Sequence, residues 1–317
     1  MPIDRTPTKV SVIGAGAVGS SVALSLLLKG VAQHVVLQDI NEAKASAEAA
    51  DMAHGSAFYP TAQIDGTGDV DATTESDVVI VTAGARQQPG QTRMDLAGAT
   101  VNLVKKILPP LVERSPQARF IMVTNPVDVV TEAALHITGL PREQLFGSGT
   151  VLDSARLRYQ ISQATGVAVR NVHAYMVGEH GDTETPLWSV ARIGGISLYD
   201  WERQTGRLGP DVRQRIVHDT VYAAYKIIEG KGATNHAIGL SAADIVQAVI
   251  RDENRILPVS SHLDDWLGIK NVTMSVPTLV GRHGASQPFE LLIDDGELAA
   301  LQHSGDTISG ELRSLGF

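Results

Sequence analysis

Short apolar runs alternate with helical patterns through the first half of the chain. Four runs contain few polar residues, as strands covered on both faces of a sheet do, and they lie at residues 8–14, 34–38, 77–82 and 119–124. Helical stretches follow the first three of them and extend to Lys29, from 42 to Met52 and from Met94 to Glu113. This alternation predicts a parallel sheet with helices on both faces.

Individual residues mark the ends of these predicted helices. Gly30 should end the first helix, since glycine adopts the left-handed conformation that often follows a helix. Asn41 is suited to capping the amino end of the second. Pro109 and Pro110 fall inside the third and should break or kink it, because proline lacks the amide proton that a helix interior requires.

The second half of the chain has a different pattern. Shorter β-like stretches and longer helical stretches replace the regular alternation, and the pattern changes near residue 147. We expect helices at 151–164, 211–229 and 237–250, strands at 173–177, 188–193 and 274–279, and a charged helix at the carboxyl end. A smaller α+β domain is therefore predicted after the parallel sheet.

The composition of the chain argues against nucleic acids, metal ions and membranes as partners. The net charge of −9 is spread along the chain and argues against nucleic acid as a ligand. There is no cysteine and no H-E-x-x-H motif, so no metal site is expected. No apolar run reaches the roughly 18 residues that span a membrane, and Met1–Lys9 lacks the apolar stretch of a signal peptide. We therefore expect no membrane partner and a cytoplasmic location.

A glycine-rich motif joins the first predicted strand to the first predicted helix. The sequence G-A-G-A-V-G occupies Gly14–Gly19, and Asp39 follows 20 residues later at the end of the next strand. In this context the glycines let a pyrophosphate approach the backbone, and the acid binds the ribose hydroxyls of NAD and repels the extra phosphate of NADP. We expect a Rossmann-type doubly wound sheet binding NAD over residues 8–147, and a smaller α+β substrate-binding catalytic domain over 148–317.

Five further segments carry a specific resemblance. In this order they resemble the motifs of the lactate and malate dehydrogenase family: G-A-R-Q-Q-P-G-Q-T-R (84–93), T-N-P-V-D (124–128), G-S-G-T-V-L-D-S-A-R-L-R (147–158), G-E-H-G-D (178–182) and G-A-T-N-H-A-I-G (232–239). They cover nearly the whole chain. The resemblance implies reversible hydride transfer between NADH and the second carbon of a 2-oxo acid.

The resemblance also implies catalytic roles. His180 would exchange the proton, which suits imidazole because its ordinary pKa lies near neutrality. Asp153 would orient His180, Arg156 would bind the substrate carboxylate from the same helical face, and Arg93 would reach the carbonyl oxygen from a closing loop. The implied substrate-binding residues are Gln87, Arg93, Asn125, Arg156 and Thr234. The implied cofactor-binding residues are Gly14, Gly16, Val18, Gly19, Asp39, Thr82, Gly84, Asn125 and Ile238.

Gln87 bears on the identity of the acid. Malate enzymes of the family have arginine where Gln87 stands, and a neutral amide cannot pair with a second carboxylate. Leaving that charge unpaired would cost about 3 kcal/mol or more, so Gln87 and Thr234 favour pyruvate and lactate. Because Arg86 is adjacent, malate remains an alternative, as does a broader 2-hydroxy acid specificity. An NAD-binding protein without catalysis is disfavoured, since every implied catalytic residue is present.

Two residues imply regulation. Arg158 and His173 match the positions at which bacterial family members that respond to fructose 1,6-bisphosphate bind this effector across a subunit interface. An equal alternative is that Arg158 is a solvated helix residue and His173 a packed strand residue, without a role in regulation. The resemblance also implies a homotetramer.

Overall fold

The computed structural model describes residues 8–85 and 93–317 and divides into two compact units. The first contains the chain up to Ser148 together with Thr234–Arg255 and Val280–Ser286. The second contains Gly149–Ala233, Ile256–Leu279 and Gln287–Phe317. The predicted NAD-binding elements lie in the first unit, and the predicted acid–base residues lie in the second.

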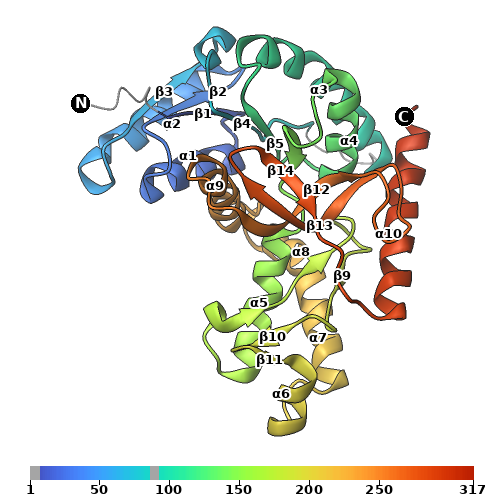
Figure 1. Cartoon of the computed structure of the whole chain (residues 1–317). Helices are drawn as coiled ribbons and strands as arrows, with labels where there is room; N and C mark the ends of the chain where they lie inside the picture. Colours follow the sequence, from blue (N-terminus) through green and yellow to red (C-terminus); the bar gives the residue numbers. More distant parts are fainter. Residues whose placement is uncertain (1–7, 86–92) are drawn as a thin grey trace, which may run out of the picture. The chain divides into compact units, whose positions relative to one another are not determined.

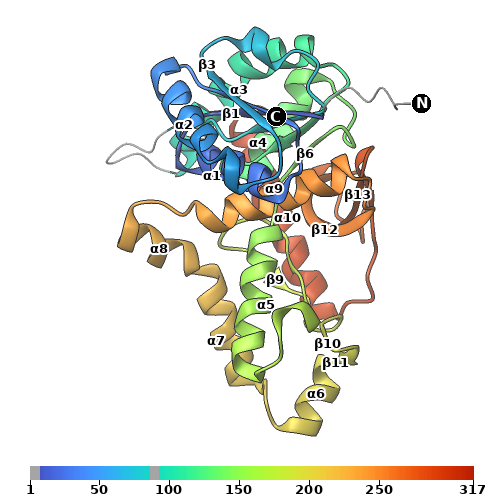
Figure 2. The same cartoon turned by 90° about the vertical axis from the view of Figure 1, so that its left-hand side faces the viewer.

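The first unit contains six parallel strands in the order β3-β2-β1-β4-β5-β6 (Figure 1 labels β1 to β5, and Figure 2 labels β6). Their bounds are β1 Lys9–Ile13, β2 His34–Gln38, β3 Gln63–Thr67, β4 Val78–Val81, β5 Arg119–Met122 and β6 Leu145–Gly147. The strand order reverses between β1 and β4, and ligands of such sheets bind at the carboxyl ends of the strands beside this point. The predicted doubly wound parallel sheet is confirmed.

Helices cover both faces of this sheet. They are α1 Ala17–Lys29, α2 Glu42–His54, α3 Arg93–Arg114, α4 Val127–Thr138 and α9 His236–Ile250, with short 3-10 turns at η1 Ser56–Phe58 and η2 Val70–Thr73. In Figures 1 and 2, α9 lies beside α1 although the two are more than 200 residues apart in the sequence. Under α3 and α4 the core is formed by strand residues such as Val79, Phe120 and Met122, all fully buried.

The predicted helix ends agree with the structure in two places and fail in one. Gly30 follows α1 with φ +56°, and the side chain of Asn41 accepts a hydrogen bond from the amide of Lys44 at 3.1 Å. The prediction that Pro109 and Pro110 break or kink α3 is wrong as to a break, because the helix continues to Arg114, whereas a kink stays a prediction. The two flanking leucines, at 108 and 111, are buried against the sheet, and this packing holds the last turns in place.

In the second unit, five helices surround short strands. The helices are α5 Val151–Thr165, α6 Leu198–Thr205, α7 Pro210–Val221, α8 Ala223–Lys231 and α10 Asp295–Ser314. The short strands are β7 Val172–His173, β8 Met176–Val177, β9 Thr185–Pro186, β10 Arg192–Ile193 and β11 Ile196–Ser197, and η3 spans Val169–Asn171. Figure 2 shows α5 and α7 side by side, with Leu157, Ile161 and Ile216 in their shared core.

The single helix expected over 211–229 is two helices that meet at Tyr222. α7 is anchored by buried Ile216 and Thr220, whereas no residue of α8 is buried. The buried side chains that hold α7 in place therefore end just before Tyr222, where the two helices meet.

The last strands run side by side in the order β12, β13, β14, with bounds Arg255–Leu263, Val272–Gly281 and Gly284–Pro288. Within the residues described, no helix has both the length and the apolar composition needed to cross a membrane.

Candidate functional site

The glycine-rich turn between β1 and α1 is tightly packed where the motif requires glycine. Gly14 has φ +104°, a conformation that side chains disfavour. A Cβ on Gly19 would lie 1.8 Å from the carbonyl oxygen of Gly14, whereas a Cβ on Gly16 would meet nothing within 4 Å. Gly19 therefore lets helix and strand approach, and Gly16 leaves open space above the amino end of α1.

The side chain of Asp39 lies beside the glycine-rich turn and is hydrogen-bonded to it. Its carboxylate accepts hydrogen bonds from the amide of Ala15 at 2.6 Å and from the amide of Asn41 at 2.8 Å. These two bonds fix the carboxylate at the carboxyl end of β2, beside the glycine turn. A ribose bound there would meet a ready hydrogen-bond acceptor.

A cavity of about 630 Å³ opens at this edge of the sheet. Its lining includes five of the predicted cofactor-binding residues, namely Gly14, Gly16, Asp39, Thr82 and Gly84. Leu103 and Ile107 of α3 add an apolar wall, suited to a flat ring. A glycine turn, a fixed carboxylate and an apolar wall are the features that a dinucleotide needs, so the residues present fit NAD.

The other predicted cofactor residues lie in the same unit but do not line this cavity. Val18 is on α1, Asn125 is exposed after β5, and Ile238 is half-buried on α9. The Asn125–Pro126 peptide bond is cis.

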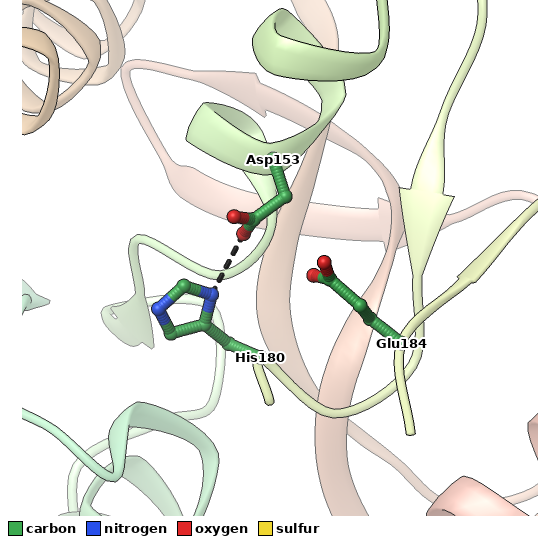
Figure 3. Close-up of side chains that lie close together, drawn as sticks. All are labelled: Asp153, His180 and Glu184. Atoms are coloured by element: carbon green, nitrogen blue, oxygen red, sulfur yellow. Dashed lines mark hydrogen bonds and ion pairs between the residues drawn. The ribbon is translucent and has the colours of Figure 1, made fainter. Parts of the chain in front are cut away.

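In the second unit the predicted acid–base residues are in direct contact. Asp153 lies in the first turn of α5, and His180 lies in the turn that follows β8 (Figure 3). Nδ1 of His180 donates to Oδ2 of Asp153 at 2.7 Å, and Nη1 of Arg156 donates to Oδ1 at 2.6 Å. Asp153 is 2% exposed. One buried carboxylate therefore holds both a histidine and an arginine.

Two hydroxyl groups fasten α5 to β8 and so bring Asp153 to His180. The hydroxyl of Thr150 donates to the carbonyl oxygen of Met176 at 2.6 Å, and Oγ of Ser154 accepts from the amide of Met176 at 2.8 Å. Beyond β8, Gly178 turns the chain with φ +95°. The amide of Gly178 donates a hydrogen bond to the carbonyl oxygen of Ser275 in β13 at 2.8 Å.

The electrostatics of Asp153 favour the ionised form. Burial alone would raise the pKa of its carboxyl, but the nearby His180 and then Arg156 outweigh burial and hold that pKa below its ordinary value. An ionised Asp153 stabilises a positive charge on the ring of His180, so the pair is suited to exchanging a proton with a substrate.

Glu184 is a member of this group that the sequence did not reveal. One carboxylate oxygen each from Asp153 and Glu184 and one ring nitrogen of His180 lie within 4.8 Å of one another (Figure 3). Its only sequence signal was its position four residues after His180, inside a polar turn typical of exposed residues. The guanidinium of Arg156 on the shared carboxylate disfavours a metal cation at this group.

The other predicted substrate and effector residues are Gln87, Arg93, Thr234, Arg158 and His173. Gln87 lies outside the described residues, and Arg93 is the first residue of α3. Thr234 is half-buried and belongs to the first unit. The two predicted effector residues are neighbours in the second unit: Nε of Arg158 donates to the carbonyl oxygen of Ala174 at 2.9 Å, beside exposed His173.

Comparisons with known proteins agree along the whole chain. Residues 8–147 match the family model described as lactate/malate dehydrogenase, NAD binding domain, and residues 150–314 match the alpha/beta C-terminal domain of the same family. The L-lactate dehydrogenase of Bifidobacterium animalis subsp. lactis is 50% identical over 313 residues, with 98% of each chain covered. L-lactate dehydrogenase 1 of Clostridium acetobutylicum is 42% identical, covering 97% of this chain and 98% of that one.

A solved structure extends this likeness to the fold. The minor L-lactate dehydrogenase of Enterococcus mundtii, in its ligand-bound form, matches with a TM-score of 0.95 at 33% identity. It covers 98% of this chain, and 99% of its own length is matched.

Proposed function

Since the chain belongs to the lactate/malate dehydrogenase family, we propose that it catalyses the reversible NADH-dependent reduction of pyruvate to (S)-lactate. It is an NAD-dependent oxidoreductase, and the expected family and cofactor are confirmed. The observation that carries the proposal is the contact of His180 and Arg156 with one buried carboxylate, that of Asp153. This group offers a proton and a cation side by side, which a 2-oxo acid needs at its carbonyl and carboxylate groups.

The proposed roles follow from this geometry. Asp153 accepts from Nδ1 of His180, so Nε2 is the nitrogen that gives its proton to the substrate carbonyl oxygen. Arg156 turns from Asp153 to the substrate carboxylate, for which a guanidinium can supply two parallel bonds. Bound NADH would supply the hydride that adds to the second carbon. Arg93 is assigned to polarising the carbonyl group, and Asn125 to a hydrogen bond with the substrate.

Cofactor binding is assigned to the first unit. Gly14, Gly16 and Gly19 would receive the pyrophosphate at the amino end of α1, and Asp39 would bind the adenosine ribose. Val18, Thr82, Gly84, Asn125 and Ile238 complete the proposed set. We keep the division of the two domains at residue 147 as a prediction.

Gln87 and Thr234 support pyruvate over oxaloacetate as the substrate. A glutamine cannot neutralise the second carboxylate of oxaloacetate, and malate dehydrogenase or a broader specificity is the alternative. The test is a panel of 2-oxo acids assayed with NADH. Pyruvate should exceed oxaloacetate in kcat/KM by on the order of a hundredfold, and Gln87→Arg should narrow or reverse that ratio. An unchanged ratio in Gln87→Arg would show that another residue selects the acid.

We also propose fructose 1,6-bisphosphate as an effector bound at Arg158 and His173. Arg192 lies opposite His173 in the antiparallel pair β7–β10, so a second arginine besides Arg158 lies near the same strand. Pyruvate saturation curves with and without the effector test this proposal, with Arg158→Gln as the variant. The homotetramer and the cytoplasmic location likewise stay predictions.

A further inference from the structure

A third ionisable side chain lies beside the Asp153–His180 pair and has no part in the roles assigned so far. Glu184 is 8% exposed, and its carboxyl group faces that of Asp153 (Figure 3). Its Oε2 atom is buried and has no hydrogen-bond partner among the residues that the structure describes. Ionised carboxylates are rarely buried with an oxygen left unsatisfied, because their desolvation is costly.

The charged groups around Glu184 come from two elements. Asp153 and Arg156 belong to α5, and Glu179 and His180 belong to the turn after β8. The donors His180 and Arg156 both bond to Asp153. Of the two facing carboxyls, Asp153 therefore has the stabilising partners for a negative charge.

Two carboxylates this close do not both ionise readily, and the less well solvated one retains its proton. Burial raises the pKa of Glu184 well above its ordinary value, and the negative charge of Asp153 raises it further. Glu179 acts in the same direction, while His180 and Arg156 oppose it without reversing the shift.

We propose that Glu184 is a positioning residue that keeps its proton at neutral pH and so leaves Asp153 as the single negative charge shared by His180 and Arg156. The inference rests on the proposed function. An ionised Glu184 would compete with the substrate carboxylate for Arg156 and would hold His180 in its imidazolium form. A neutral Glu184 leaves Arg156 available to the substrate and lets His180 change its charge during turnover.

The first test is Glu184→Gln, which mimics the protonated side chain, with Glu290→Gln as a control at an exposed position of the same unit. At neutral pH, kcat/KM for pyruvate should stay within about threefold of the wild-type value, the scatter of a mild substitution. If Glu184 were ionised, removing a charge within 4.8 Å should change that value by on the order of a hundredfold, which would overturn the inference.

The pH profile separates positioning from packing. At alkaline pH the wild-type Glu184 ionises, and its charge then competes with the pyruvate carboxylate for Arg156. Glu184→Gln lacks this charge, so it should keep its kcat/KM for pyruvate to a higher pH than the wild type and Glu290→Gln. If the three proteins lost kcat/KM for pyruvate at the same alkaline pH, the proposal would be contradicted, because a residue with a packing role alone would not change that pH.

A second test needs no substrate. Infrared spectra of the wild type labelled with ¹³C-glutamate should show a buried glutamic acid band at neutral pH that becomes a carboxylate band as the pH rises, and Glu184→Gln, labelled in the same way, should lack that band, which separates it from the other buried glutamates. If the infrared spectrum at neutral pH showed only carboxylate bands from glutamate, the inference would be overturned, even if the enzyme reduced pyruvate. Failure to reduce any 2-oxo acid would refute the proposed function and leave this spectrum informative.

Discussion

Replacing Asp153 by asparagine tests how the buried carboxylate acts on His180. The change removes the negative charge from two contacts, 2.7 Å to His180 and 2.6 Å to Arg156, and keeps the shape of the side chain. A hydrogen bond to a charged group contributes about 1.5–3 kcal/mol, and unit charges about 4 Å apart interact by about 4 kcal/mol at an effective dielectric of about 20. With Asp153 only 2% exposed, water screens these contacts little.

A loss of about 2–4 kcal/mol corresponds to a fall in kcat/KM for pyruvate of about thirtyfold to about a thousandfold at neutral pH. The sign of the pH dependence follows from the charge. Without Asp153 the pKa of His180 falls, so less imidazolium is present at neutral pH and more is recovered as the pH is lowered. Lactate oxidation should show the same fall in kcat/KM at each pH, because the equilibrium constant fixes the ratio of the two directions when cofactor binding is unchanged.

The assay is the absorbance of NADH in both directions between about pH 5 and about pH 9, across the titration range of histidine. Fluorescence titration with NADH checks that cofactor binding is unchanged. Asp306→Asn, an exposed position on α10, provides the matched control. A loss of the same size at every pH would refute the proposed action through His180.

Two further predictions concern residues outside this pair. Gly19→Ala should destabilise the fold by about 1–3 kcal/mol, because its Cβ would meet the carbonyl oxygen of Gly14. Gly16→Ala should keep the wild-type Tm and weaken NADH binding, because its Cβ would meet nothing in the protein. Equal losses of Tm in the two variants would contradict this prediction. Because the folded-state pKa of Glu184 lies above its unfolded value, its contribution to stability is complete at acidic pH and is lost as pH rises through the folded pKa. Glu184→Gln should therefore match the wild-type Tm near pH 4 and exceed it at about pH 8, and calorimetry showing no gain at the higher pH would refute the direction of the shift.

The sequence predicted the elements whose signals are local. The strand His34–Gln38 and the cap at Asn41 were correct because apolar runs and capping side chains act over a few residues. The edge strand Gln63–Thr67 was missed since its sequence, Q-I-D-G-T, has one buried residue and little apolar pattern. The helix does not break at Pro109 and Pro110, because burial of the neighbouring residues outweighs the missing amide protons.

The candidate site shows the same limit. His180, Asp153 and Arg156 were found through motifs, and two of them lie three residues apart on one helix. Glu184 was not found, because only the packing of α5 against the turn after β8 buries its carboxyl group and places it beside Asp153. Burial of a charged residue is a tertiary property, and a polar run of sequence carries no sign of it.

The central claim is that His180 supplies the proton for reduction of a 2-oxo acid, and His180→Gln tests it most directly. The measurement is kcat/KM for pyruvate with NADH, made alongside NADH affinity in the same preparations of wild type and variant. We predict rapid pyruvate reduction by the wild type, a loss of about a hundredfold to about ten-thousandfold in the variant, and unchanged NADH affinity. A variant that reduces pyruvate within about threefold of the wild type would contradict the claim, since it would show that the proton comes from elsewhere.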